Sequence, residues 1–172
     1  MGSRAWPPPN GCSVPISDRL AQFPGAKDAL RFLGQLRCPT RTSAVRSVLD
    51  GVLVTHTLKR KGVRPLLATA GAKSTSHDLQ RSMQVSDAVD AGLALLPVAP
   101  TCLRRSVTLI RELDRLGLAA ALHVGVRTVG EQPEAHAWVQ VGDVVVNDDP
   151  KVTEAYVELA AGDLQRLLPL LG

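Results

Sequence analysis

The chain contains few cysteines, few aromatic residues and no long hydrophobic run. Its three cysteines show neither a paired spacing nor a CxxC motif, which argues against a disulfide framework or a cysteine-based metal site. Aromatic residues make up 3% of the chain, too few for the base-stacking platforms of nucleic-acid binders. No stretch approaches the ~18 apolar residues of a membrane span, and the amino terminus lacks a signal-peptide core. These absences predict a cytoplasmic protein that binds neither nucleic acid nor membrane.

The remaining composition fits one well-cored unit. With 172 residues and 45% hydrophobic content, the chain is long enough for a single compact domain with a small helical annex. The formal net charge of +4 comes mostly from arginines spread along the predicted helices, which is typical of a solvated surface. The sequence has no Gly-rich phosphate loop and no cluster of metal-ligating residues. We therefore expect neither a cofactor nor a metal.

The first 75 residues are predicted to contain helices and no strands. Residues 1–15 are rich in proline and are expected to form a flexible tail, ahead of a helical N-terminal part at 16–75. Helices are expected in three places within this part, at 17–24, 26–37 and 43–62. The third of them carries an apolar stripe, formed by Val45, Val48, Leu49, Val52 and Leu53.

Residues 76–172 are predicted to form the core domain, with helices followed by an antiparallel meander. After a loop at 68–78, Ser86 is expected to cap one helix, and Thr101 to cap a second helix. Gly117 is the predicted stop of that second helix. Strands are expected at 118–128, 136–141, 144–147 and 155–159, before a closing helix at 162–171. This order of elements indicates an α+β fold.

Cys102 has the position of an activated nucleophile. It follows the predicted N-cap Thr101, so it lies in the first turn of a helix, where unpaired backbone N–H groups and the helix dipole stabilise an anion. Arg104 and Arg105 favour the thiolate in the same way if they lie close. These features predict a lowered pKa for the thiol. The alternative for a lone cysteine in this place is a small buried filler.

A histidine and two aspartates later in the chain supply what a cysteine nucleophile needs. The stretch EAHAWVQVGDVVVNDD places His136 at the head of a predicted strand, and Asp148 and Asp149 at the end of the paired one. An imidazole takes the thiol proton and later returns it to a leaving amine, while a carboxylate on its far nitrogen fixes the tautomer. Together with Cys102, these residues match a Cys-His-Asp triad.

The other histidines and cysteines lack such partners. His123 lies within an apolar strand and is expected to be a satisfied sheet histidine. His56 and His77 have no metal-ligating neighbours at useful spacing. Cys12 lies in the tail and Cys38 precedes a proline, so both are interpreted as incidental.

The blocks around the candidate triad resemble a known family. VAPTCLRRSVTLIRELDRLGLAAALHVGV, followed by EAHAWVQVGDVVVND, is similar to the leader peptidase of lasso-peptide biosynthesis, a Cys-His-Asp protease of the B-protein type within the transglutaminase-like superfamily. Members carry CLRRS-type, GVR-type and HAWV-type blocks in this order, and the resemblance covers residues 80–150. The chain departs from the commoner pattern at Gln140 and in its turn of Gly142 and Asp143, neither of which touches the candidate triad.

The resemblance implies a papain-like fold and a peptidase activity. Cys102 would attack the peptide bond that joins leader to core in a precursor peptide, with His136 as general base and acid and Asp148 as its orienter. The family works with a small winged-helix protein that grips the leader and with an ATP-using lasso cyclase. Because the first 75 residues read as helices without the strands of a winged domain, we expect a separate recognition protein.

Two arguments disagree on which aspartate faces the histidine. The family spacing, twelve positions after His136, selects Asp148. If Gly142 and Asp143 form a strict two-residue turn, strand pairing instead brings Asp149 opposite the histidine. A bulge, a three-residue turn or a strand that has ended by residue 147 would remove this second argument. We expect Asp148.

Two other functions remain open from the sequence. A transglutaminase-like acyl transferase would keep the same chemistry and pass the thioester of Cys102 to an amine. A non-catalytic peptide-binding module would carry a degenerate triad and use its basic surface to hold an acidic peptide or RNA.

Overall fold

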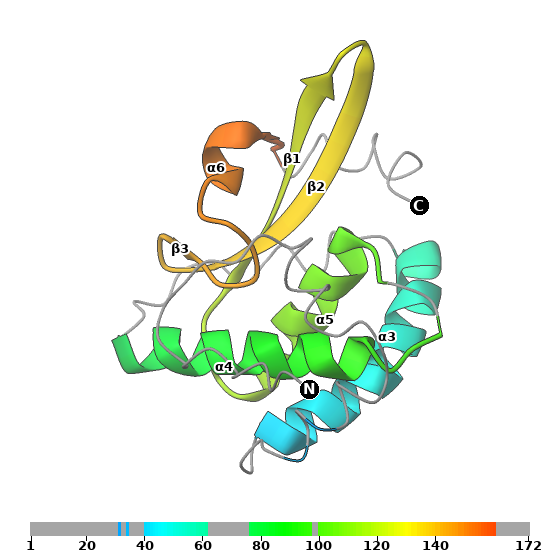
Figure 1. Ribbon diagram of the computed structural model, residues 1–172, viewed down its shortest axis with the longest axis vertical. Coiled ribbons are helices and arrows are strands. Elements are labelled where there is room, and N and C mark those ends of the chain that lie inside the picture. The colour runs from blue at the N-terminus through cyan, green and yellow to red at the C-terminus, as the bar shows by residue number, and fades with distance from the viewer. Residues whose placement is uncertain (1–30, 32–33, 35–39, 62–75, 98–99, 161–172) are drawn as a thin grey trace, which may run out of the picture.

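The computed structural model describes residues 31, 34, 40–61, 76–97 and 100–160 (Figure 1). Helices come first and an antiparallel sheet follows, so the predicted α+β class is confirmed. The elements are α3 (Thr40–Lys61), α4 (Ser76–Leu93), α5 (Cys102–Arg115), β1 (Ala121–Val129), β2 (Gln132–Val141), β3 (Val144–Val145), α6 (Val152–Ala155) and β4 (Val157–Glu158).

The central helix α5 has both of the ends that its sequence predicts. Thr101 is the N-cap, and its Oγ1 accepts the backbone N–H of Arg104 at 3.3 Å. At the other end Gly117 adopts φ +69°, which a residue without Cβ tolerates best. The N–H of Leu118 then returns to the carbonyl of Leu113 at 2.9 Å, as in a Schellman motif. These caps fix where α5 begins, and therefore where Cys102 lies.

The sheet is a four-stranded antiparallel meander in the order β3-β2-β1-β4. Val141 pairs with Val144 across Gly142 and Asp143, so the strict two-residue turn is confirmed. The pairing then stops early. β3 ends at Val145, and the predicted strand at 144–147 is too long.

The helices cover one face of the sheet. Figure 1 shows α3, α4 and α5 gathered at one end of the molecule, with the long β1–β2 hairpin projecting from them. Between α5 and the sheet lies the main core, which includes Leu103, Val107, Leu122, Val124 and Val139. A smaller cluster covers the opposite face of the sheet and contains Trp138, Val145, Val152 and Tyr156. Side chains therefore reach the sheet from both sides.

One helix prediction needs correction, and it concerns α4. This helix begins at Ser76, so Ser86 lies in its middle and does not cap it, and residues 76–78 are not loop. Leu79 and Met83 pack against the main core and extend the apolar face of the helix toward its start. Tertiary packing thus outweighs the weak helix preference of this serine-rich stretch.

The apolar stripe on α3 faces outward. Val45, Leu49, Val52 and Leu53 are each more than half exposed. The buried face of α3 is made largely of small or polar residues, among them Ser43, Ala44, Ser47 and Asp50. The cause is a close helix crossing, since a Cβ on Gly92 of α4 would lie 2.2 Å from the carbonyl oxygen of Ala44. Large side chains do not fit between helices at that separation.

The last predicted strand is also partly wrong. The short helix α6 occupies Val152–Ala155, and only Val157–Glu158 form β4. The tail at 1–15, the loop at 68–75 and the closing helix at 162–171 lie outside the described residues. So do the helices at 17–24 and 26–37, apart from Arg31 and Gly34, which are helical.

Candidate active site

Cys102 is the first residue of α5 and its side chain is half-buried. Burial raises the pKa of this thiol. The hydrogen bond and positive charge of His136, together with the backbone N–H groups of Ala137 and Leu103, lower it by more, so the pKa of Cys102 lies below its ordinary value. The thiolate is therefore favoured, as expected for a cysteine at a helix start.

His136 lies on β2 between the thiol and a carboxylate. Its Nε2 is 2.5 Å from Oδ2 of Asp148, which leaves Nδ1 as the nitrogen available to Cys102. Burial lowers the pKa of this imidazole, while the hydrogen bonds and negative charges of Asp148 and Cys102 raise it to a net value of about 9. At neutral pH the arrangement favours a thiolate and an imidazolium side by side.

Of the two neighbouring aspartates, Asp148 contacts the histidine. It is buried, and its Oδ1 accepts the backbone N–H of Asp149 at 2.7 Å. The carboxylate of Asp149 is used elsewhere, since its Oδ1 accepts the backbone N–H of Lys151 at 2.8 Å. Strand pairing would have favoured Asp149, but β3 ends at Val145, and the chain bends before the aspartates. The alternation of side chains along a strand therefore does not extend to them.

A buried ion pair lies behind Asp148. The guanidinium of Arg105 pairs with both carboxylate oxygens of Asp90 on α4, and its Nη1 donates to the carbonyl of Asn147 at 2.5 Å. Arg105 and Asp90 are almost completely buried. The sequence suggested that Arg105 would favour the thiolate if it lay close to Cys102, whereas in the structure Arg105 ties α4 and α5 to the residue before Asp148.

The side chain of Asn147 joins the same segment to β2. Its Oδ1 accepts the backbone N–H of Val139 at 2.7 Å, and its Nδ2 donates to Oγ of Ser106 at 2.9 Å. Ser106 in turn donates to the carbonyl of Ala137 at 2.9 Å. Asn147 and Ser106 were not singled out from the sequence, because Ser106 lies 31 positions from Ala137 and 41 positions from Asn147.

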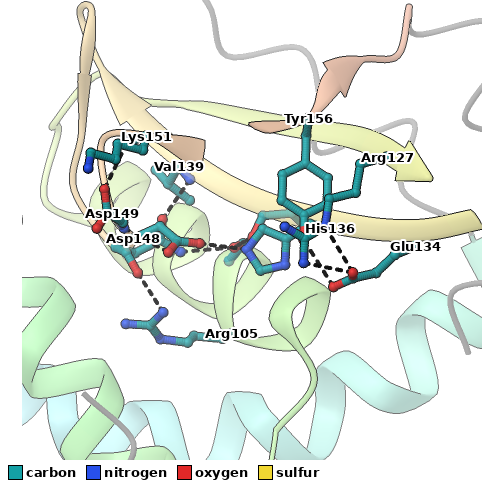
Figure 2. A network of polar contacts seen from close by, with 12 residues as sticks. Arg105, Arg127, Glu134, His136, Val139, Asp148, Asp149, Lys151 and Tyr156 are labelled. Atoms are coloured by element: carbon teal, nitrogen blue, oxygen red, sulfur yellow. Dashed lines mark hydrogen bonds and ion pairs between the residues drawn. The ribbon is translucent and has the colours of Figure 1, made fainter. Parts of the chain in front are cut away.

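On the side of the imidazole that faces away from the main core, an aromatic ring stacks on His136 (Figure 2). The ring of Tyr156 lies 5.1 Å from that of His136, and its hydroxyl donates to Oε1 of Glu134 at 3.0 Å. Arg127 donates to Oε2 of Glu134 at 2.8 and 2.9 Å, and its Cζ lies 4.6 Å from the centre of the tyrosine ring. Gly125 makes room, since a Cβ there would approach Cβ of Tyr156 to 2.9 Å.

The other candidates from the sequence lie apart from this constellation. His123 pairs with Glu158 at 2.7 Å and stacks on Trp138 at 5.8 Å, as a satisfied sheet histidine does. His77 is exposed on α4. The side chain of His56 and all of Cys12 and Cys38 lie outside the described part of the chain.

The described residues contain neither a metal-ligating cluster nor a membrane-spanning helix. Across 40–61, 76–97 and 100–160, no three His, Cys, Asp or Glu side chains are grouped so as to hold a metal ion. Within the same ranges, no helix has both the length and the apolar character that crossing a membrane requires.

The fold and the Cys-His-Asp geometry agree with the family model that the chain matches. Residues 45–161 match the family model of the transglutaminase-like superfamily, and the chain belongs to this superfamily, which includes cysteine peptidases and acyltransferases. No curated protein and no solved structure matches the chain. The matched range starts within α3, which packs on α4 and α5, while the division of the chain near residue 75 stays a prediction.

Proposed function

We propose that this protein is a cysteine peptidase that removes the leader from a lasso-peptide precursor. The observation that carries the proposal is the contact of Asp148 with His136 and of His136 with Cys102 at the start of α5. The CLRRS and HAWV blocks, which supply Cys102 and His136, support the lasso-peptide family within the superfamily. Superfamily membership alone is compatible with peptidases and acyltransferases.

In the first half-reaction the thiolate of Cys102 attacks the carbonyl carbon of the bond between leader and core. As the first residue of α5, Cys102 has a backbone N–H without an acceptor in its own helix, and this group is suited to stabilise the oxyanion. The imidazolium of His136 gives its proton to the departing nitrogen as the C–N bond breaks. The core leaves as a free amine and the leader remains as a thioester.

In the second half-reaction His136, now neutral, takes a proton from water, and the resulting hydroxide attacks the thioester carbon. The C–S bond breaks, the leader leaves as a carboxylic acid and the thiolate is restored beside an imidazolium. Asp148 keeps the proton of Nε2 in place throughout, so that Nδ1 stays directed toward the thiol.

The outer edge of β2 suits an extended peptide substrate. On this strand the backbone groups of Val139 and Ala137 point away from β1. The N–H of Val139 donates to the side chain of Asn147, and the carbonyl of Ala137 accepts from the hydroxyl of Ser106 on α5. Alternation makes Ala135 the next outward residue, and the described residues provide no backbone partner for it. Because the N–H of Ala137 contacts the thiol of Cys102, a peptide paired at Ala135 would pass close to the nucleophile.

A separate winged-helix recognition protein and a lasso cyclase are the proposed partners, on the basis of the family resemblance alone. With such a recognition protein the leader is held near the active site, so cleavage should accelerate through effective concentration. Precursor cleavage by the isolated chain should be slow, and adding the recognition protein should raise it. A rate that no partner changes would contradict this part of the proposal.

Mass spectrometry of a candidate precursor peptide tests the activity. The wild-type chain should release the leader as a free acid, and Cys102→Ala should release none while keeping its melting temperature, since Ala is well tolerated in helices. Asp143→Asn, at the exposed hairpin turn, is the matched control and should cleave normally. A leader joined to an added amine would identify an acyl transferase. Peptide binding without cleavage would identify a binding module.

Ala135→Pro tests the peptide-binding edge separately. Proline is compatible with an outward edge position, as Pro133 at the preceding outward position of β2 shows, but it removes the backbone donor. We expect kcat/KM for the peptide to fall about tenfold, through loss of a hydrogen bond to the substrate. Alkylation of Cys102 should be unchanged. An unaltered kcat/KM would mean that the peptide binds elsewhere.

A further inference from the structure

The imidazole of His136 must make two contacts at once, and its strand does not determine its orientation. Nε2 has to face Asp148 while Nδ1 faces Cys102. The torsion that turns a histidine ring is broad, so the backbone of β2 leaves the plane of the ring open. Something packed against the face of the ring has to select that plane.

Tyr156 is the group packed against that face. The two rings are stacked with centres 5.1 Å apart and planes 28° apart, and Tyr156 is 9% exposed. It reaches the site from the end of α6, a different part of the chain from the strand that carries His136. The stack therefore closes only when α6 and β4 are folded against the sheet.

Tyr156 is itself held at its hydroxyl and over its ring. Glu134 accepts the tyrosine hydroxyl with one oxygen and the guanidinium of Arg127 with the other. Arg127 and Glu134 are direct neighbours across β1 and β2, and Arg127 also lies over the tyrosine ring. We call Arg127, Glu134 and Tyr156 the rim cluster.

We propose that Tyr156, held by Glu134 and Arg127, is the positioning residue that fixes the plane of the His136 ring between Cys102 and Asp148. The proposal rests on the proposed roles of Cys102 and His136. A tyrosine face suits the task because it packs against a neutral imidazole and attracts an imidazolium, so the contact persists as the proton comes and goes.

The charged groups around His136 decide how the test must be designed. The ring faces Cys102 from α5, Asp148 from the segment after β3, and Glu134 from its own strand, with Arg127 on β1 beyond. Changing Glu134 therefore alters a charge as well as a contact. Glu134→Gln and Glu134→Ala both remove the charge, but only Ala removes the acceptor of the tyrosine hydroxyl.

The pH dependence of Cys102 alkylation by iodoacetamide, read by mass spectrometry of the peptide containing Cys102, provides the test. It needs no substrate, so it reports on the rim cluster even if the precursor is never cleaved. Tyr156→Leu should free the imidazole, weaken its bond to the thiol and move the midpoint up by about one pH unit. Tyr156→Phe keeps the ring but loses the hydrogen bond of its hydroxyl to Glu134, so its midpoint should lie between those of the wild type and Tyr156→Leu. On the precursor, kcat of Tyr156→Leu should fall about tenfold with KM unchanged.

Val152→Ala is the control for simple loss of packing. Val152 belongs to the same small cluster as Tyr156, so the substitution destabilises that cluster without removing the ring from His136. Its alkylation midpoint should match the wild type. An equal shift in Val152→Ala, or no shift in Tyr156→Leu, overturns the proposal. If Tyr156→Leu does not fold, the Glu134 pair decides: a higher midpoint for Ala than for Gln supports the proposal, and equal midpoints overturn it.

Discussion

The two residues that complete the candidate triad with Cys102, Asp148 and His136, have opposite kinds of surroundings. Behind Asp148 lies an interior network in which every residue is at most 3% exposed, made of Asp90, Arg105, Ser106 and Asn147. Beside His136 lies the rim cluster, where the side chains of Arg127 and Glu134 are 41% and 46% exposed. One support is part of the core, and the other is largely in solvent.

The difference separates what holds the fold from what adjusts the site. In the interior, burial lowers the pKa of Arg105, but the charge and hydrogen bonds of Asp90 raise it by more, so the pair stays charged. Removing either partner alone would leave a buried charge unpaired. At the rim, water screens the same kind of pair, so its loss costs little stability. The carboxylate is thus fixed by folding itself, whereas the imidazole depends on contacts that can change without unfolding.

The largest expected effect comes from the carboxylate at the centre of the comparison. Asp148→Asn should lower kcat by about two to four orders of magnitude, because an amide can stabilise neither the imidazolium nor the required tautomer. Asp149→Asn is the matched control, since an asparagine can still accept the N–H of Lys151. Its kcat should remain near that of the wild type. If kcat collapsed in Asp149→Asn alone, Asp149 and not Asp148 would be the residue that orients the imidazole.

Removing one half of the interior ion pair should have the next largest effect. Arg105→Ala leaves the carboxylate of Asp90 buried and unpaired, which costs about 3 to 5 kcal/mol of unfolding free energy. In the double variant Arg105→Met with Asp90→Leu, apolar side chains replace both charges, and most of the stability should return. Activity should not return, because the donor to the carbonyl of Asn147 is still missing. Urea denaturation and kcat measured on the same variants check both statements.

The pH dependence of turnover should be limited on the alkaline side by His136. Its pKa is raised to about 9, and the proton that it carries is the one given to the leaving nitrogen. The rate should therefore fall as pH rises above about 9, by about tenfold per pH unit. On the acid side the limit should lie below the ordinary thiol pKa, because that of Cys102 is lowered. An alkaline limb near pH 6.5, the ordinary value for histidine, would show that the ion pair does not form.

The sequence was sufficient for the elements that carry local signals. Thr101 and Gly117 mark the two ends of α5, and together they place Cys102 at a helix start. Gly142 and Asp143 give the turn of the hairpin and its register. In each case a cap or a tight turn acts over a few neighbouring residues, so one short stretch contains the whole reason for the structure.

The supports of the site could not be predicted in the same way. Arg105 looked like a solvated or thiol-facing charge, because its partner Asp90 lies on another helix. Tyr156 gave no pattern, since its contact with His136 exists only after α6 and β4 fold back on the sheet. The outward orientation of the stripe on α3 has a related cause, since the close approach of α3 to Gly92, which excludes large side chains, is a property of two helices together.

The smallest expected effect, and the one that sharpens the comparison most, comes from the exposed ion pair. Arg127→Ala should leave the melting temperature unchanged within error, because a screened surface pair contributes little to stability. It should still lower kcat several-fold, since Glu134 loses the partner that holds it against Tyr156. High salt should imitate the substitution, because at 1 M the screening length falls to about 3 Å. The wild type should then lose activity toward the level of the variant, while the variant itself barely responds to salt. If Arg127→Ala instead lowers the melting temperature as much as Arg105→Ala does, the rim cluster holds the fold as the interior network does, and the distinction between the two supports is wrong.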